Sequence, residues 1–372
     1  MVVIYRKYRP KTFSEIVGQE HIIKILQNQL LSNQVSHAYL FYGPRGTGKT
    51  TVGRLLAKAI NCQNSQKIKM GAEKRPQIEP CNQCSSCQQI NQQRSIDLIE
   101  IDAASNRGIE EIRNLREGAK IVPTMSKYKI YILDEAHQLT SEASNALLKT
   151  LEEPPKHVIF ILCTTEFSKV LSTIASRCQK FNFKKLNVGQ IEQKLKKDAE
   201  GEKIKIENEA LNLIARASGG SIRDAEGFLD KVITLQNKII TKEEAEEILG
   251  FVETKIISEL IDAILSKNQK KCFAILETNL EQDIDIGQFT KSILEYLRNL
   301  LLIKIDHTLL SPETSGFTKE EIEILKKQSE KIEKEKLEKI IEKLLETQNL
   351  IRWSDNPRIP LEIAIAKAVA IV

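Results

Sequence analysis

The sequence predicts an α/β core, in which a parallel sheet is flanked by helices, followed by two all-helical parts. Short apolar runs alternate with helical patterns through the first half of the chain, and the strand signal fades after about residue 182. From about residue 250 onward, the periodic segments have helical spacing. Alternating strands and helices are typical of parallel sheets, which bind ligands at the carboxyl ends of their strands.

Four short apolar runs are the expected strands of the core. They lie at 38–42, 97–101, 129–133 and 158–163, and turn or polar residues follow each of them. Helical periodicity fills the segments between these runs. The segment after Leu139 places its apolar residues on one face, and we expect this helix to stop at Pro154 because proline lacks the N–H that a helix interior needs.

We expect three domains in the 372 residues. The α/β core should occupy residues 1–181, a small helical domain 182–246, and an all-helical domain 247–372. In the last of these, the apolar residues between 337 and 345 recur at three- and four-residue spacing. A final helix is expected to begin after Pro360.

The composition favours an intracellular globular protein. A hydrophobic content of 41% is enough for a real core, and no apolar run approaches the roughly 18 residues that a membrane span needs. The N-terminus lacks the apolar region of a signal peptide. The net charge of +5 is too mild to indicate nucleic-acid binding by itself, although several basic residues between 6 and 11 precede any acid.

A glycine-rich loop directly after the first strand predicts a nucleotide site. Its residues Gly43, Pro44, Arg45, Gly46, Thr47, Gly48, Lys49 and Thr50 fit the phosphate-loop pattern G-x-x-x-x-G-K-[ST]. Glycines let backbone N–H groups face phosphate oxygens, and the following helix adds its positive end. We expect Lys49 to reach the β- and γ-phosphates of ATP and Thr50 to bind Mg²⁺, and we include Thr51 among the nucleotide-binding residues.

Two acids at the end of a later strand support the nucleotide site. The apolar run before Asp134 and Glu135 follows the loop by about eighty residues, with one more expected strand between them. Asp134 can hold Mg²⁺ through water, and Glu135 can orient or deprotonate the attacking water. The string from Asp134 to His137 also spells the label of a helicase class, but four letters on such a strand specify little.

Three cysteines predict a structural Zn²⁺ site. Cys81, Cys84 and Cys87 follow the spacing C-x-x-C-x-x-C, and a closed tetrahedral site needs a fourth ligand. No histidine lies nearby, so Cys62, at the end of the helix after the phosphate loop, is the natural fourth ligand in a module at about 62–87. The alternative is a cluster of free thiols. Catalysis is not expected from four sulfur ligands with no open position.

These elements, in this order, resemble the gamma/tau subunits of bacterial DNA polymerase III, within the clamp-loader branch of the AAA+ ATPases. Besides the loop and the inserted cysteine module, the strings that carry the resemblance lie at 8–13, 17–20, 103–108, 147–155 and 356–362. The resemblance is dense over about residues 1–235, thin through 250–350, and returns at the end. It implies a AAA+ ATPase core, a helical lid and an oligomerising collar domain.

The resemblance also implies roles for individual residues. Arg9, Pro10 and Val17 belong to strings similar to the clamp-loader box that wraps the adenine. Thr165 is similar to the sensor-1 residue that detects the γ-phosphate, and Thr164 is its nearest rival.

Two arginines receive roles from the same resemblance. Arg177, in a Ser-Arg-Cys string, would act in trans on the ATP of a neighbouring subunit, and Arg223 looks like the sensor-2 arginine of the lid. A planar, permanently charged guanidinium suits both roles because negative charge spreads over the γ-phosphoryl oxygens in the transition state.

Two departures from the family pattern bear on these expectations. Eighteen residues separate Cys62 from Cys81, which is longer than the family's usual spacing. Glu226 and Gly227 stand where the family tends to have Leu-Ser, so we expect a difference in lid packing. Longer tau forms carry a C-terminal extension that binds polymerase and helicase. The chain ends at Val372 without one, which favours a short gamma-like form or a truncated one.

The function implied is that of the ATPase motor subunit of a clamp loader, within the DNA-directed DNA polymerase III complex. The implied cofactors are ATP, Mg²⁺ and Zn²⁺. The implied partners are the delta and delta-prime subunits and further copies of the chain in a hetero-pentamer, together with the beta sliding clamp, primer–template DNA and the polymerase III core. No membrane is involved, and the expected location is the bacterial cytoplasm, at the nucleoid.

Two other classes remain open at this stage. A different AAA+ motor, such as a branch-migration helicase, would share the ATP site but would separate strands and would lack the cysteine module. A structural organiser would keep full function after mutation of the phosphate loop.

Overall fold

The computed structural model describes residues 3–64, 69–70, 76–234, 239–250, 254–280, 285–306, 308–310, 319–351 and 353–372. The chain forms two compact units, Met1–Lys194 with Ser218–Gly227, and Leu195–Ala217 with Phe228–Val372. The finer division into three domains stays a prediction. Among the described residues, no helix combines the length and apolar content needed to cross a bilayer.

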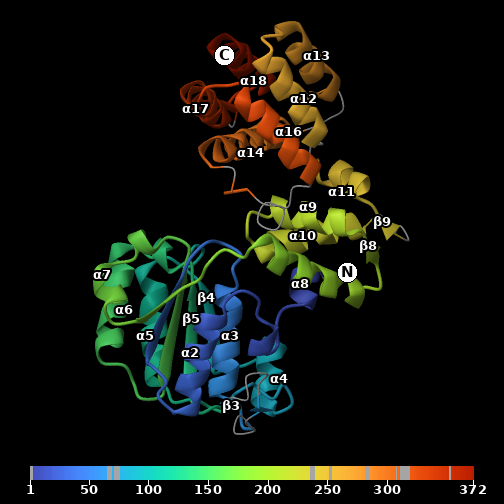
Figure 1. Ribbon diagram of the computed structural model, residues 1–372. Helices are drawn as coiled ribbons and strands as arrows, with labels where there is room; N and C mark the ends of the chain where they lie inside the picture. Colours follow the sequence, from blue (N-terminus) through green and yellow to red (C-terminus); the bar gives the residue numbers. More distant parts are fainter. Residues whose placement is uncertain are drawn as a thin grey trace. The chain divides into compact units, whose positions relative to one another are not determined.

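A five-stranded sheet forms the centre of the first unit (Figure 1). Its strands are β1 (Ala38–Tyr42), β4 (Leu98–Asp102), β5 (Lys129–Asp134), β6 (Val158–Thr164) and β7 (Gln179–Asn182). The spatial order is β4-β5-β6-β1-β7, and all paired strands are parallel. The prediction of a parallel sheet flanked by helices is therefore confirmed. Strand β7 was not predicted, because it is short, has alternating exposure and lacks a continuous apolar run.

Helices cover both faces of this sheet, with α2 and α3 on one face and α5 and α6 on the other. The helices that precede β7 are α1 (Ile4–Lys7), α2 (Glu20–Leu31), α3 (Lys49–Ile60), α4 (Ser85–Asn91), α5 (Ile109–Lys120), α6 (Ser141–Glu152) and α7 (Ser172–Ala175), with 3₁₀ turns η1 (Phe13–Glu15), η2 (Ala136–Gln138) and η3 (Phe167–Lys169). Side chains alternate between the two faces of a strand. Tyr39 and Phe41 accordingly pack with α2 and α3, whereas Leu40 packs with the opposite layer of α5 and α6.

Two short pairs of strands accompany the main sheet. The pair β2 (Lys69–Met70) and β3 (Pro76–Gln77) is antiparallel and lies in the cysteine module. The pair β8 (Lys205–Ile206) and β9 (Ile239–Ile240) is parallel and lies in the segment that the sequence predicts as wholly helical. Two-residue strands carry no periodicity that a sequence pattern could detect.

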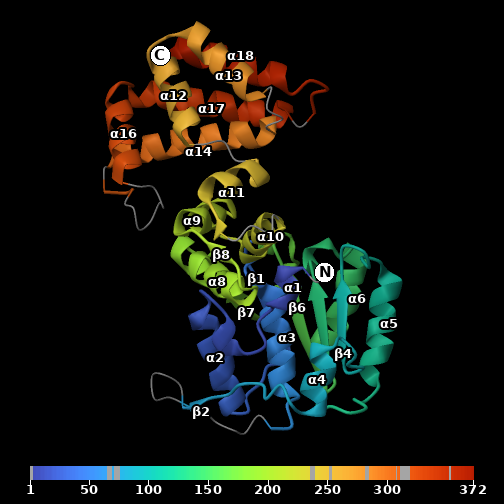
Figure 2. The ribbon, with the colours of Figure 1, turned by 90° about the vertical axis from the view of Figure 1, so that its right-hand side faces the viewer.

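The remaining elements are helices (Figure 2). They are α8 (Val188–Gly201), α9 (Asn208–Ala217), α10 (Ile222–Ile233), α11 (Lys242–Leu249), α12 (Thr254–Leu265), α13 (Gln269–Leu280), α14 (Ile286–Ile305), α16 (Lys319–Glu330), α17 (Lys334–Ile351) and α18 (Arg358–Ile371). Helices α12 to α18 share one continuous apolar core. The last helix begins at Arg358 rather than after Pro360, because a proline is tolerated in the first helical turn, where backbone N–H groups have no intrahelical partner.

Candidate functional site

The loop between β1 and α3 has the geometry of a phosphate-binding loop. Gly43, Gly46 and Gly48 all have positive φ, at 144°, 72° and 95°. Only glycine adopts such values freely, and they turn successive backbone N–H groups toward one side of the loop. Gly43 is also sterically required, since a Cβ there would lie 2.2 Å from the backbone oxygen of Phe183.

Lys49 and Thr50 lie at the start of α3 and face the acidic end of β5. The Lys49 ammonium donates to the backbone oxygens of Gly43 at 2.9 Å and Pro44 at 2.8 Å. Burial lowers the pKa of Lys49, while the charges of Asp134 and Glu135 act in the opposite direction. Thr50 Oγ1 donates to Asp134 Oδ2 at 2.9 Å, so the two expected Mg²⁺ ligands already lie side by side.

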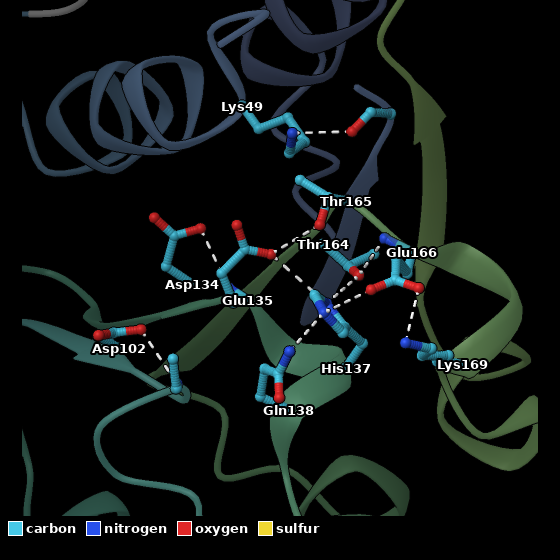
Figure 3. A network of polar contacts seen from close by, with 12 residues as sticks. Lys49, Asp102, Asp134, Glu135, His137, Gln138, Thr164, Thr165, Glu166 and Lys169 are labelled. Carbon is cyan, nitrogen blue, oxygen red and sulfur yellow. Dashed lines mark hydrogen bonds and ion pairs between the residues drawn. The ribbon is translucent and has the colours of Figure 1, made fainter. Parts of the chain in front are cut away.

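Glu135 occupies a conformation that is unusual for a non-glycine residue, with φ at 48°. Its carboxylate Oε2 accepts a hydrogen bond from Thr165 Oγ1 at 3.0 Å (Figure 3). Its backbone N–H donates to Asp134 Oδ1 at 3.1 Å. This turn aims the second acid of the strand tip at the end of β6, where Thr165 lies.

His137 joins this network, although no role was predicted for it. Its side chain is 3% exposed, and its ring nitrogens lie 2.9 Å from Thr164 Oγ1 and 3.3 Å from Glu166 Oε1 (Figure 3). Nδ1 also lies 3.4 Å from Glu135 Oε2. Thr164 thus contacts His137, whereas its neighbour Thr165 reaches Glu135. The one feature of the sequence that could have indicated a role for His137 is its position two residues after Glu135.

A cavity of about 320 Å³ brings most of the expected site residues together, which is within the usual range for small-molecule pockets. The expected residues that line it are Arg9, Pro10, Val17, Arg45, Gly46, Thr47, Gly48, Lys49, Thr50, Thr51, Asp134, Glu135, Thr165 and Arg223. These residues come from the N-terminal segment, the phosphate loop, two strand ends and the start of α10, and all of them belong to the first unit.

The first turn of α10 closes against the phosphate loop. The N–H of Ile222 donates to the backbone oxygen of Gly46 at 3.0 Å. A Cβ on Gly46 would lie 1.9 Å from Ser221 Oγ, so only glycine allows this approach. The Arg223 guanidinium lies over the Tyr5 ring, 5.2 Å from its centroid.

A buried ion pair lines the same cavity and was not foreseen. Lys194 Nζ lies 3.1 Å from Glu226 Oε1, and the two side chains are 10% and 7% exposed. Glu226 is one of the two residues that depart from the family pattern, and its ion pair joins α8 to α10. The expected difference in lid packing stays a prediction.

Arg177 does not line this cavity. Its guanidinium donates to Glu152 Oε1 at 2.6 Å and to the backbone oxygen of Thr173 at 2.8 Å, and its side chain is 35% exposed. The ion pair between Arg177 and Glu152 is exposed, and an ion pair of this kind contributes little to stability. The geometry therefore leaves Arg177 accessible to another molecule.

The four cysteines of the predicted module converge. The sulfur atoms of Cys62, Cys81, Cys84 and Cys87 all lie within 4.8 Å of one another. The distances from Cys81 to Cys87 and from Cys62 to Cys84 are 3.9 and 4.0 Å. A tetrahedral Zn²⁺ with bonds near 2.3 Å places its sulfur ligands about 3.8 Å apart, so this set fits the metal, and the long spacing before Cys81 does not prevent Cys62 from joining it.

The surroundings differ between the four thiols. Burial raises the pKa of Cys62 and of Cys87. Burial acts in the same direction on Cys81, but hydrogen bonds from the backbone N–H groups of Gln83 and Cys84, together with the neighbouring thiols, lower its pKa to about 6. Backbone N–H groups aimed at a sulfur in this way are suited to a metal-bound thiolate.

Three family models match successive parts of the chain. Residues 18–187 match "DNA polymerase III, delta subunit", residues 190–238 match "DNA polymerase III clamp loader subunit, ATPase lid domain", and residues 240–372 match "DNA polymerase III subunits gamma and tau domain III". The three matches follow one another along almost the whole chain.

Curated relatives align over nearly the full chain. The chain is 41% identical over 367 residues to DNA polymerase III subunit tau of Bacillus subtilis, covering 98% of this chain and 62% of that protein. It is 34% identical over 369 residues to DNA polymerase III subunit tau of Escherichia coli, covering 99% of this chain and 55% of that protein. The chain thus spans a little over half the length of these relatives.

Among solved structures, the chain is similar to a Holliday junction branch migration motor of Thermotoga maritima. The TM-score is 0.48 at 18% identity, and the alignment covers 69% of this chain and 79% of that one. This likeness is too low to bear on function.

Proposed function

Because the chain belongs to the gamma/tau family of DNA polymerase III subunits, we propose that it is the ATP-driven motor subunit of a bacterial clamp loader. In this role it binds and hydrolyses ATP, opens the sliding clamp and loads it on primed DNA. The observation that carries the proposal is the cavity in which the phosphate loop, the acid pair and a lid arginine meet.

The role proposed for each residue in this cavity follows from its charge and its position. The backbone of residues 43–48 and the Lys49 ammonium take the phosphates, and Thr50 with Asp134 holds Mg²⁺. Glu135 orients the attacking water, and its hydrogen bond to Thr165 joins it to the residue proposed to detect the γ-phosphate. Arg223, from the lid, is within the same cavity and would contact the terminal phosphate.

Arg177 would complete the ATP site of a neighbouring subunit. Its exposure and its position outside its own cavity support a role in trans. To act, the guanidinium exchanges its exposed contact with Glu152 for the γ-phosphate of the neighbour. The exchange is favourable because phosphate offers a more highly charged partner in a drier site.

The cysteine module would hold one structural Zn²⁺. Four sulfur ligands close the tetrahedral site, so no position remains for water or substrate. Its role in the proposal is to stabilise the module, and no catalytic step is assigned to the metal.

The all-helical C-terminal part would form the collar that joins this chain to the delta and delta-prime subunits and to further copies of itself in a hetero-pentamer. The assembly would bind the sliding clamp, primer–template DNA and the polymerase III core at the nucleoid. Recognition of DNA through backbone phosphates predicts an affinity that falls steeply with salt.

An ATPase assay with purified partner subunits tests the proposal. Hydrolysis should rise only when both the sliding clamp and primed DNA are present. Lys49→Ala should abolish clamp loading because the phosphates lose their buried cation. A Lys49→Ala protein that still loads clamps with the ATP dependence of the wild type would refute the motor role and favour a structural organiser.

The trans role has its own test in mixed assemblies. Arg177→Ala should slow hydrolysis by a factor of about 10³ or more at the site formed with an unmodified ATP-bearing neighbour, as loss of a trans-acting arginine does elsewhere. Nucleotide binding by the Arg177→Ala subunit itself should be unchanged. Normal hydrolysis in such mixtures would contradict the assignment.

A further inference from the structure

The cysteine module is tied directly to the N-terminal segment of the first unit. Glu79 lies two residues before Cys81 and is half-buried. Its carboxylate accepts the backbone N–H of Phe13 at 2.6 Å and that of Ser14 at 3.0 Å. A charged acceptor with two backbone donors makes a strong link, and these contacts connect segments that lie more than sixty residues apart in the chain.

A second contact reinforces the first. Lys58 is 2% exposed, and its ammonium donates to the backbone oxygen of Lys11 at 2.8 Å and to Asn82 Oδ1 at 2.7 Å. Asn82 Nδ2 donates to the same Lys11 oxygen at 3.1 Å. Asn82 lies between Cys81 and Cys84 and has φ at 58°, a left-handed conformation that asparagine tolerates.

The segment held by these contacts is one wall of the nucleotide cavity. Residues 11–14 lie between two cavity-lining stretches, 9–10 and 15–17. Once phosphates fill the loop, the base of a nucleotide must occupy the remaining cavity, whose apolar lining comes from Pro10, Ile16, Val17, Leu186 and Ile222. Three of these residues, Pro10, Ile16 and Val17, closely flank the tethered residues 11–14, so the position of that segment decides the shape of the base-binding wall.

A metal bound to the four cysteines would hold Glu79 and Asn82 in position. Residues 78–84, which carry Glu79 and Asn82, contain no helix or strand. Cys81 and Cys84 are the points at which this stretch joins the sulfur cluster. Bonds to Zn²⁺ would fix Cys81 and Cys84, and with them the stretch that carries Asn82 and adjoins Glu79, more firmly than the weak contacts between free thiols do.

We propose that the Zn²⁺ module positions the base-binding wall of the nucleotide cavity through Glu79, Asn82 and Lys58, so that metal occupancy sets the affinity for ATP. The inference rests on the proposed nucleotide site. Glu79 is a positioning residue, because it contacts the wall rather than the nucleotide.

The test compares the binding of ATP with that of inorganic tripolyphosphate, which carries no base. Both dissociation constants are measured by calorimetry for the wild-type chain, for Glu79→Gln, and for wild-type chain stripped of metal by a chelator. Glu117→Gln is the matched control, because Glu117 is exposed on α5 and forms an exposed ion pair with nearby Lys120. Metal content and melting temperature are recorded for every sample.

We expect Glu79→Gln to retain its zinc and its fold but to bind ATP about tenfold more weakly, a change of about 1.4 kcal/mol. Metal removal should weaken ATP binding at least as much. Binding of tripolyphosphate should change by less than about twofold in both cases, and Glu117→Gln should match the wild type. Re-addition of Zn²⁺ should restore ATP affinity in the stripped chain but not in Glu79→Gln.

Three results would overturn the proposal. One is unchanged ATP affinity in Glu79→Gln or in the stripped chain, and another is an equal loss for ATP and tripolyphosphate, which indicates general damage to the cavity. The third is a wild-type chain that carries no zinc. Failure of the wild type to bind ATP at all would instead refute the proposed function. The experiment therefore distinguishes failure of the proposed function from failure of the proposed role of the cysteine module.

Discussion

Single buried charges in the core each have specific polar partners. Lys49 and Lys58 donate to backbone oxygens, and Asp97, which is 2% exposed, accepts three backbone N–H groups. Burying a charge without such partners would cost several kcal/mol. Asp97 thereby holds the turn before β5, whose far end carries the acid pair of the nucleotide site.

Replacing Asp97 with asparagine should destabilise the protein at neutral pH by about 1–3 kcal/mol. Burial alone would raise the pKa of Asp97, but hydrogen bonds from the N–H groups of Thr124, Met125 and Ser126 lower it overall. A lowered pKa in the folded state means that the stabilisation is present above the unfolded value of about 3.9 and is lost as the pH falls through the folded value.

Urea unfolding at a series of pH values checks this prediction. The difference in free energy of unfolding between wild type and Asp97→Asn should be largest near neutrality and should shrink as the pH is lowered below about 4. Glu110→Gln, on the exposed surface of α5, should show little difference at any pH. A constant difference at all pH values would contradict the charge-based explanation for Asp97.

At the scale of whole elements, the start of helix α10 packs directly against the phosphate loop at Gly46. Gly46 and Gly48 both have positive φ, but their surroundings differ. A Cβ at Gly46 would meet Ser221 Oγ at 1.9 Å and Ser221 Cβ at 2.9 Å, whereas a Cβ at Gly48 would meet nothing within 4 Å. Rotation of the serine side chain cannot relieve the second of these contacts.

Gly46→Ala should therefore weaken ATP binding more than Gly48→Ala, by a further factor of about ten. Both changes add backbone strain of about 1–2 kcal/mol, but only Gly46→Ala also forces the start of α10 away from the loop. Adding Ser221→Gly to Gly46→Ala should recover part of the affinity. Equal losses in the two single variants, with no recovery in the double variant, would show that the contact with Ser221 has no effect.

For the molecule as a whole, the C-terminal helices have their own core and their own buried polar network. Tyr296 donates to Gln328 Oε1 at 2.7 Å, and Gln328 donates to the backbone oxygen of Ser258 at 3.1 Å. The network links three helices of the proposed collar. Large apolar side chains remain exposed near the connection of α17 to α18, including Leu350 and Trp353. Exposed large apolar side chains can mark an interaction surface.

Trp353 is the only tryptophan in the chain and is 90% exposed, so it can report on assembly. If the collar joins subunits through this region, tryptophan emission should move to shorter wavelength as the chain assembles with clamp-loader subunits, because the indole leaves water. Dilution that separates the subunits should reverse the change. Assembly seen by sedimentation with unchanged emission would place the subunit contacts elsewhere on the collar.

The sequence by itself determined the features that depend on local spacing. The phosphate loop was predictable because glycines and Lys49 lie within eight consecutive residues, and the thiol cluster because C-x-x-C-x-x-C already brings three sulfurs together. Strands β1, β5 and β6 were predictable because they are almost wholly buried and their apolar runs are nearly continuous, and the edge strand β4 was predictable from a shorter apolar run. Family resemblance added Thr165, Arg177 and Arg223, whose spacing alone indicates nothing.

The tertiary structure alone decided which distant residues meet. Glu79 reaches Phe13, Lys194 pairs with Glu226, and His137 lies beside Thr164, although each pair is separated by 27 or more residues. A polar residue far from its partner carries no periodic signal, because its role depends on the path of the whole chain. Burial, which gives these contacts their strength, likewise exists only after the layers have packed.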